Sequence, residues 1–122
     1  MKKLSSIWLI GEIAFIFYML SIPGSNLPRI NYWGQDKTVH IILFGSLMFA
    51  ALFHFDQLET AFFKTTRARA LTMIVCIVYG IAMEFYQKYF VPSRGFEVAD
   101  MLADAAGVIA SLPLYQKIMR RK

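Results

Sequence analysis

The sequence predicts an all-α polytopic membrane protein with four antiparallel transmembrane helices. Of its 122 residues, 57% are apolar and only 17% are charged, and the mean hydropathy is +0.49. A soluble domain of this size needs more polar surface than that, because its surface is large relative to its volume. The apolar residues also gather in four sparsely charged blocks, each close to the length of a membrane span.

The four blocks define the expected helices. Spanning the hydrocarbon core takes ~20 helical residues, with a lower limit near ~17, and lipid offers the backbone no hydrogen-bond partner outside a helix. The blocks do not alternate apolar and polar residues as the strands of a membrane β-barrel do. We expect one domain, residues 1–122, with short connections that make consecutive helices antiparallel neighbours. The expected helices cover about residues 5–22, 38–55, 70–88 and 98–116.

The distribution of basic residues predicts the orientation of the helices. Nine of the thirteen Lys and Arg residues precede the first block, follow the fourth, or lie between the second and third. The positive-inside rule therefore places both termini in the cytoplasm. The net charge of +5 is then explained by membrane topology and by attraction to the anionic inner leaflet, so no nucleic-acid partner is predicted. Glu12, within the first block, argues against a cleaved signal peptide.

The first and second blocks carry polar groups at different depths. Glu12 lies eight residues into the first expected helix, ~12 Å from its inner end. Its role is open: it pairs with His40 or Arg94, or it is protonated. The second block opens with Asp36-Lys37-Thr38-Val39-His40, and the i, i+4 spacing puts Asp36 and His40 on one helical face. Ionisable groups inside a membrane are costly, and by default they indicate a function.

The third and fourth blocks carry further polar residues at helical spacing. On one face of the third block lie Gly80, Glu84 and Gln87. On one face of the fourth lie Asp100, Asp104, Gly107 and Ser111. Glu84 and Asp104 are each six residues from the outer helix end, which puts them ~9 Å deep. Asp36 and Asp100 lie in first helical turns, where the positive end of the helix dipole stabilises carboxylates.

Antiparallel packing brings these residues to one level of the bundle. The second and fourth expected helices begin at the outer face, and the third ends there. We therefore predict a polar cluster at the outer end, drawn from separate stretches of sequence. Its expected members are Asp36, Lys37, His40, Glu84, Gln87, Arg94, Asp100 and Asp104.

Several interpretations of this cluster stay open. One is an outward-facing pocket for an amphiphilic or charged envelope ligand. Another is a structural ion-pair network, in which Lys37 and Arg94 neutralise the aspartates and Gly107 allows close helix approach. A third is catalysis with Glu84 as general base and His40 as its partner, although no nucleophilic Ser or Cys stands out.

A metal site is a weaker interpretation of the same residues. His40, Glu84, Asp100 and Asp104 offer one imidazole and three carboxylates, which suit ions such as zinc or manganese. No HExxH, HxH or CxxC spacing supports it, so no metal or cofactor is predicted.

Four short motifs together resemble a known family. In order they are Asp36-Lys37-x-x-His40, Glu84-x-x-Gln87, Pro92-x-Arg94 and Asp100-x-x-x-Asp104-x-x-Gly107. With the Ser21-Ile22-Pro23 exit from the first helix, they are similar to the VanZ-like family of bacterial membrane proteins over residues 21–107. The resemblance implies a multi-pass protein of the bacterial cytoplasmic membrane, in a family named for low-level resistance to the glycopeptide teicoplanin. The family often has asparagine where this chain has Asp104, which adds a charge to the cluster.

The leading hypothesis combines the cluster with this resemblance. An outward-facing polar pocket would bind a cell-envelope component, such as a lipid-linked cell-wall intermediate or a lipopeptide, with Gln87 orienting a carboxylate. The link to glycopeptide or envelope-stress resistance is implied by the family. Two alternatives remain: a membrane-embedded, metal-assisted enzyme acting on lipid or lipid-linked headgroups, and a structural helix bundle without a ligand. The sequence leaves open whether the protein is an enzyme.

Overall fold

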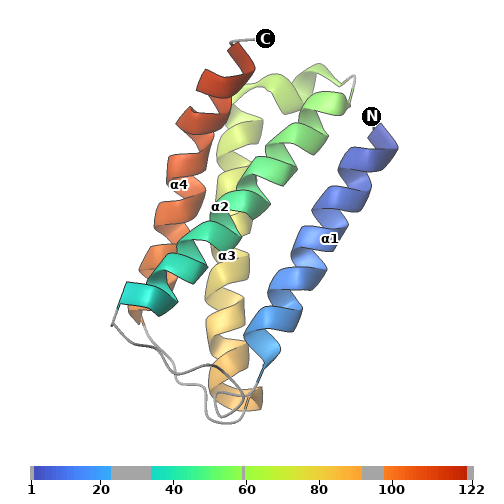
Figure 1. Ribbon diagram of the computed structural model, residues 1–122. Coiled ribbons are helices and arrows are strands. Elements are labelled where there is room, and N and C mark those ends of the chain that lie inside the picture. Colours follow the sequence, from blue (N-terminus) through green and yellow to red (C-terminus); the bar gives the residue numbers. More distant parts are fainter. Residues whose placement is uncertain (1, 23–33, 59, 92–97, 121–122) are drawn as a thin grey trace.

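The computed structural model describes residues 2–22, 34–58, 60–91 and 98–120 (Figure 1). These residues form a four-helix bundle, and none of them lies in a strand. The elements are α1 (Lys2–Ser21), α2 (Gly34–Gln57), the 3-10 helix η2 (Ala61–Lys64), α3 (Thr66–Phe90) and α4 (Val98–Arg120). Each of the four α-helices is long and apolar enough to cross a membrane. The predicted all-α, multi-pass fold is therefore confirmed.

The helices extend beyond the apolar blocks that predicted them. α2 and α3 each begin four residues before their expected starts, and α4 ends four residues after its expected end. The reason is that backbone hydrogen bonding continues into the polar turns that flank each span. Thr65 sets the start of α3, because its hydroxyl accepts a hydrogen bond from the Ala68 amide at 3.1 Å. Such a cap satisfies one of the amides that a helix start leaves without an intrahelical partner.

The bundle has two distinct ends. We call "terminal end" the one that holds the starts of α1 and α3 and the ends of α2 and α4 (Figure 1). The "far end" holds the ends of α1 and α3 and the starts of α2 and α4. Side-chain contacts agree: Ser5 lies 3.0 Å from His54 at the terminal end, and Ser21 lies 2.9 Å from Tyr86 at the far end. The cytoplasmic location of the terminal end stays a prediction from charge.

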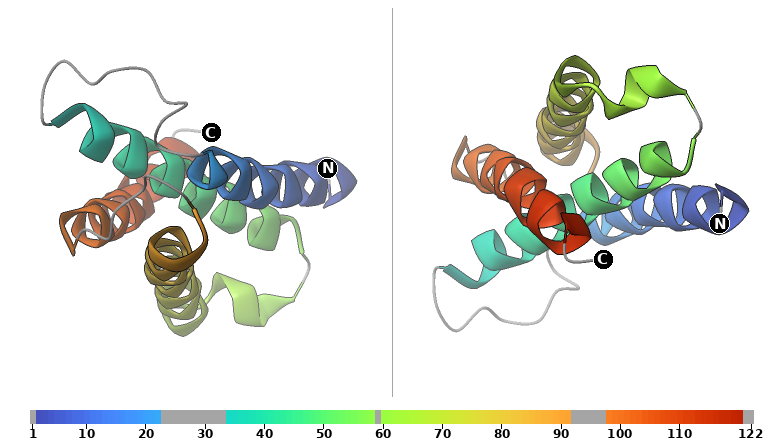
Figure 2. Two further views of the ribbon diagram at one scale, coloured as in Figure 1. Left: turned by 90° about the horizontal axis from the view of Figure 1, so that it is seen from below. Right: turned by 90° about the horizontal axis from the view of Figure 1, so that it is seen from above.

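The helix α2 is central, and it packs against each of the other three (Figure 2). Its most extensive partner is α4. The two backbones approach closely at Gly107, where an added Cβ would lie 2.3 Å from the Ile41 carbonyl oxygen. The Ser111 hydroxyl crosses the same interface, 2.8 Å from the Gly45 carbonyl oxygen. Small residues are typical of close helix pairs in membranes.

The helix α1 is packed much more lightly. Its buried residues are Ser5, Ile16 and Leu20. Many of its large apolar side chains, such as Ile7 and Ile10, stay exposed. An extended apolar surface of this kind marks a protein or membrane contact, and in a span-length helix it fits lipid.

Candidate functional site

Four ionisable side chains from three helices are buried together at the far end. His40 comes from α2, Glu84 from α3, and Asp100 and Asp104 from α4. Relative exposure is 1% for His40, 0% for Glu84 and 1% for Asp104. Buried charged groups are rare unless they are paired or functional, so this concentration calls for a physical account.

The His40 imidazole bridges the two aspartates. Its Nδ1 lies 2.8 Å from Asp104 Oδ1, and its Nε2 lies 3.7 Å from Asp100 Oδ2. Asp100 and Asp104 are one helical turn apart on α4, which is why both reach the same ring. Lys37, one turn before His40 on α2, lies 3.0 Å from Asp100 through its Nζ. The cluster is thus a chain of charges from Lys37 to Asp104.

The helix α3 completes the cluster with Glu84. His40, Glu84 and Asp104 each contribute one ligand atom, and these three atoms lie within 4.8 Å of one another. Gly80, one turn earlier on α3, makes room for this arrangement, because a Cβ there would lie 2.9 Å from Asp104 Oδ2. One imidazole and two carboxylates form a donor set that zinc or manganese accepts. These three residues are therefore the ones that would hold a metal ion.

The described part of the cluster is rich in carboxylates. Glu84, Asp100 and Asp104 supply three of them, and the Lys37 ammonium and the His40 imidazole lie beside them. Carboxylate oxygens accept hydrogen bonds and bind cations, so this part of the cluster suits a ligand that supplies a proton, a cation or a hydrogen-bond donor.

Most of the predicted cluster assembles in the structure. Lys37, His40, Glu84, Asp100 and Asp104 come together as described. The backbone of Asp36 belongs to α2, but its side chain lies outside the described residues, and so does all of Arg94.

Gln87 makes a contact that the sequence did not indicate. Its amide Nε2 donates a hydrogen bond to the Leu20 carbonyl oxygen at 3.0 Å. The residue therefore joins α3 to the last turn of α1, and its expected role in orienting a carboxylate stays a prediction. The bond satisfies a carbonyl that a helix end leaves without an intrahelical partner.

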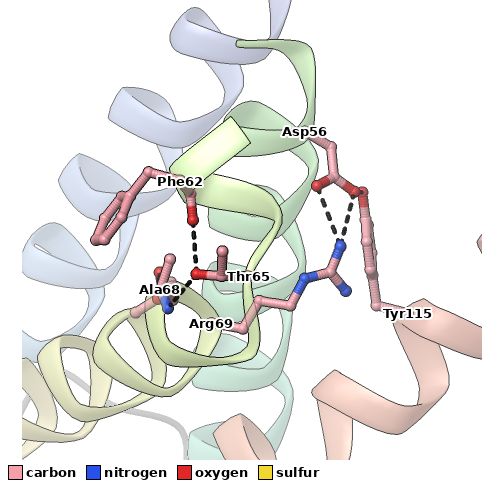
Figure 3. A network of polar contacts seen from close by, with 7 residues as sticks. Asp56, Phe62, Thr65, Ala68, Arg69 and Tyr115 are labelled. Atoms are coloured by element: carbon pink, nitrogen blue, oxygen red, sulfur yellow. Dashed lines mark hydrogen bonds and ion pairs between the residues drawn. The ribbon is translucent and has the colours of Figure 1, made fainter. Parts of the chain in front are cut away.

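A second polar network, at the terminal end, was not foreseen (Figure 3). Tyr115 Oη donates to Asp56 Oδ2 at 2.6 Å, and Arg69 Nη2 donates to Asp56 Oδ1 at 3.2 Å. The Arg69 guanidinium carbon also lies 5.9 Å from the centre of the Tyr115 ring. One feature of the sequence indicates this network: the opposite charges Asp56 and Arg69 lie near the two ends of one short connection.

Glu12 also has a partner that its position in the sequence did not indicate. The Ser46 hydroxyl of α2 donates a hydrogen bond to Glu12 Oε1. This contact joins α1 to α2 within the membrane-spanning part of both helices. Glu12 thus lies apart from the His40 contacts described above.

Comparisons of the chain with protein-family models, curated proteins and solved structures find no match. The resemblance to the VanZ-like family therefore depends on the four motifs, and the site is interpreted from its own geometry. That geometry is a buried cluster of imidazole and carboxylates, with a lysine at its edge.

Proposed function

We propose that this chain is a VanZ-like protein of the bacterial cytoplasmic membrane, whose far end binds the polar part of a cell-envelope component. A lipid-linked cell-wall intermediate or a lipopeptide is the expected class of ligand, and binding would contribute to glycopeptide or envelope-stress resistance. The observation that carries the proposal is the chain of charges Lys37–Asp100–His40–Asp104, joined by Glu84 from α3.

The gradient of burial along this chain supports binding from the far end. The side chains of Lys37 and Asp100 are 13% and 7% exposed, whereas that of His40 is 1% exposed. The Lys37 ammonium suits a phosphate, and the carboxylates accept hydrogen bonds from hydroxyl, amide or amine groups. Envelope intermediates combine these groups in one polar head. The three carboxylates in the described part of the cluster match a ligand that supplies donors.

A purely structural role accounts for less of the geometry. Close packing of α2 on α4 is already provided by Gly45, Gly107 and Ser111. A buried ion pair adds little net stability over apolar packing. The cluster is therefore better explained by a ligand than by the need to hold helices together.

The test compares the two histidines of α2. His40→Ala and Glu84→Ala are expected to insert in the membrane at the wild-type level, yet to abolish protection of a teicoplanin-sensitive bacterium. His54→Ala is the matched control, because His54 lies at the opposite end of the same helix and contacts Ser5. Protection is measured as the inhibitory concentration of teicoplanin at equal membrane levels of each variant. Full protection by the His40 and Glu84 variants would show that the binding proposal is wrong.

The second candidate is a metal-assisted enzyme acting on lipid headgroups. It is favoured by the 4.8 Å grouping of ligand atoms from His40, Glu84 and Asp104. A divalent ion held there would supply Lewis-acid chemistry toward a phosphoryl oxygen or a water. Elemental analysis of protein gently extracted with its lipids decides between the candidates. A stoichiometric ion, with headgroup release that a chelator stops, favours the enzyme; a retained lipid without an ion favours binding.

A further inference from the structure

The terminal half of the bundle holds an apolar cavity between α1, α2, α3 and η2. The volume of the cavity is about 490 Å³. Together with the space at its open side, the empty volume is about 1030 Å³. The walls include Leu9 of α1, Leu47 of α2 and Val75 of α3. Val75 is 66% exposed although it lines the cavity, so the cavity opens sideways, toward the lipid around the bundle. It is separate from the His40 cluster, and the inference drawn from it does not depend on the proposed function.

The length of the cavity matches one leaflet of a bilayer. Its wall on α3 runs from Ala68 to Tyr79, which is ~16 Å at 1.5 Å per residue. The hydrocarbon core is ~30 Å thick, so one leaflet contributes about half of that. At the deep end, Tyr79 Oη donates a hydrogen bond to the Ile13 carbonyl oxygen at 3.0 Å. That bond joins α3 to α1 near the middle of both helices.

The rim of the cavity is aromatic and basic. Phe55 and Phe63 stack at the mouth with ring centres 4.7 Å apart, at the level where aromatic rings favour the membrane interface. Arg67 is exposed and directly precedes Ala68 of the cavity wall; Lys64 is exposed, directly follows Phe63 of the wall, and also lines a second hollow that contains Asp56. Of the nearby acidic residues, Asp56 is bound to Arg69, and Glu59 lies outside the described residues. The first turn of α1 adds two more basic residues to this end, Lys2 and Lys3.

We propose that the cavity holds one acyl chain of an anionic glycerophospholipid, with its headgroup phosphate at Lys64 and Arg67. The positive rim favours an anionic headgroup over a zwitterionic one.

Native mass spectrometry of the purified full chain tests this. The protein is offered equal amounts of phosphatidylglycerol and phosphatidylcholine with identical acyl chains. We expect the wild type to retain one phosphatidylglycerol with about a tenfold preference over phosphatidylcholine. Equal retention of both lipids, or a second protein copy in place of lipid, would overturn the proposal.

A matched pair of substitutions locates the bound chain. Val75→Trp fills the cavity and is expected to reduce phosphatidylglycerol retention at least tenfold. Val78→Trp is the control, because Val78 is 55% exposed on the same helix but does not line the cavity. Wild-type retention by Val75→Trp would contradict the assigned site. Val75→Trp should keep wild-type teicoplanin protection, because Val75 is not part of the His40 cluster. Failure of the lipid proposal can therefore be told apart from failure of the His40 proposal.

A rim variant covers the case in which Val75→Trp does not fold. Lys64→Gln with Arg67→Gln should remove most of the roughly tenfold preference for phosphatidylglycerol, with phosphatidylcholine retention unchanged. Lys88→Gln, an exposed lysine at the far end, is the control and should leave the preference unaltered. If the double variant keeps the wild-type preference for phosphatidylglycerol, Lys64 and Arg67 do not bind the headgroup, and the proposal is wrong.

Discussion

The two ends of the bundle each hold an aspartate-based polar network, and they differ in composition and burial. At the terminal end, one carboxylate, Asp56, meets one guanidinium, Arg69, and one hydroxyl, Tyr115. The Asp56 and Arg69 side chains are 22% and 18% exposed. Among the described residues of the far end, three carboxylates lie beside one imidazole and one ammonium, and the His40 and Asp104 side chains are almost fully buried.

The difference separates a structural network from a candidate site. The Asp56 network is neutral and reaches water, so it joins the ends of α2 and α4 to the start of α3 at modest desolvation cost. The His40 cluster buries ionisable side chains from three helices, where ion pairs add little net stability over apolar packing. Ionisable groups gathered inside a membrane-spanning bundle in this way indicate a functional site by default. The contrast leads to three predictions, ordered from the largest expected change in stability to the smallest.

Gly107→Ala is expected to have the largest effect on stability, about 3 kcal/mol. Its Cβ would lie 2.3 Å from the Ile41 carbonyl oxygen, so α2 and α4 must move apart. The same movement separates His40 from Asp104, so teicoplanin protection should be lost as well. The measurement is unfolding by SDS in mixed micelles, followed by circular dichroism. Gly11→Ala is the control, because nothing lies within 4 Å of its Cβ; an equal loss in both variants would refute close packing at Gly107.

We replace one aspartate by asparagine at each end of the bundle. The terminal-end variant should lose stability, and the far-end variant should lose function. Asp56→Asn removes the charge that binds Arg69 and should lower the free energy of unfolding by about 2 kcal/mol, with protection retained. Asp100→Asn should change stability by less than ~1 kcal/mol, because asparagine keeps a carbonyl oxygen for the Lys37 ammonium. Protection, however, should fall at least tenfold, because the carboxylate between Lys37 and His40 is lost. Loss of protection in Asp56→Asn together with full protection in Asp100→Asn would contradict this assignment of the two ends.

Tyr115→Phe should have the smallest effect, about 1 kcal/mol of stability. It removes the hydrogen bond to Asp56 Oδ2 but keeps the Asp56–Arg69 pair and the aromatic ring. Tyr89→Phe serves as the reference, since Tyr89 is 66% exposed at the end of α3. The measurement is the same SDS titration. A loss of protection in Tyr115→Phe would show that the terminal end is more than structural.

The fold could be predicted because membrane spans are defined by length and apolarity, which are local properties of the sequence. The far-end cluster was largely predictable for a related reason. The i, i+4 spacing of Asp100 and Asp104 fixes a face of α4, and antiparallel order fixes the level at which α2, α3 and α4 meet. Neither argument needs the tilt or rotation of a helix. Helix ends were missed by up to four residues, because caps such as Thr65 lie outside the apolar blocks.

The missed contacts all depend on how helices are rotated and tilted against one another. Gln87 donates to Leu20 only because α1 ends beside it, and Glu12 meets Ser46 only because those faces of α1 and α2 are turned together. Tyr115 reaches Asp56 across the bundle for the same reason. Such orientations are set by side-chain packing along the whole interface, which a residue pattern within one helix does not specify.

The most direct test of the central claim is cross-linking from the far end in living cells. A photoreactive phenylalanine analogue replaces Thr38, an exposed α2 residue next to Lys37, and in a second strain it replaces Gln57 at the terminal end of the same helix. Adducts are identified by mass after irradiation. We predict that Thr38 captures an envelope component with a polar headgroup, that His40→Ala abolishes this adduct, and that Gln57 does not form it. An adduct at Thr38 that persists in His40→Ala would contradict a binding site built on the His40 cluster.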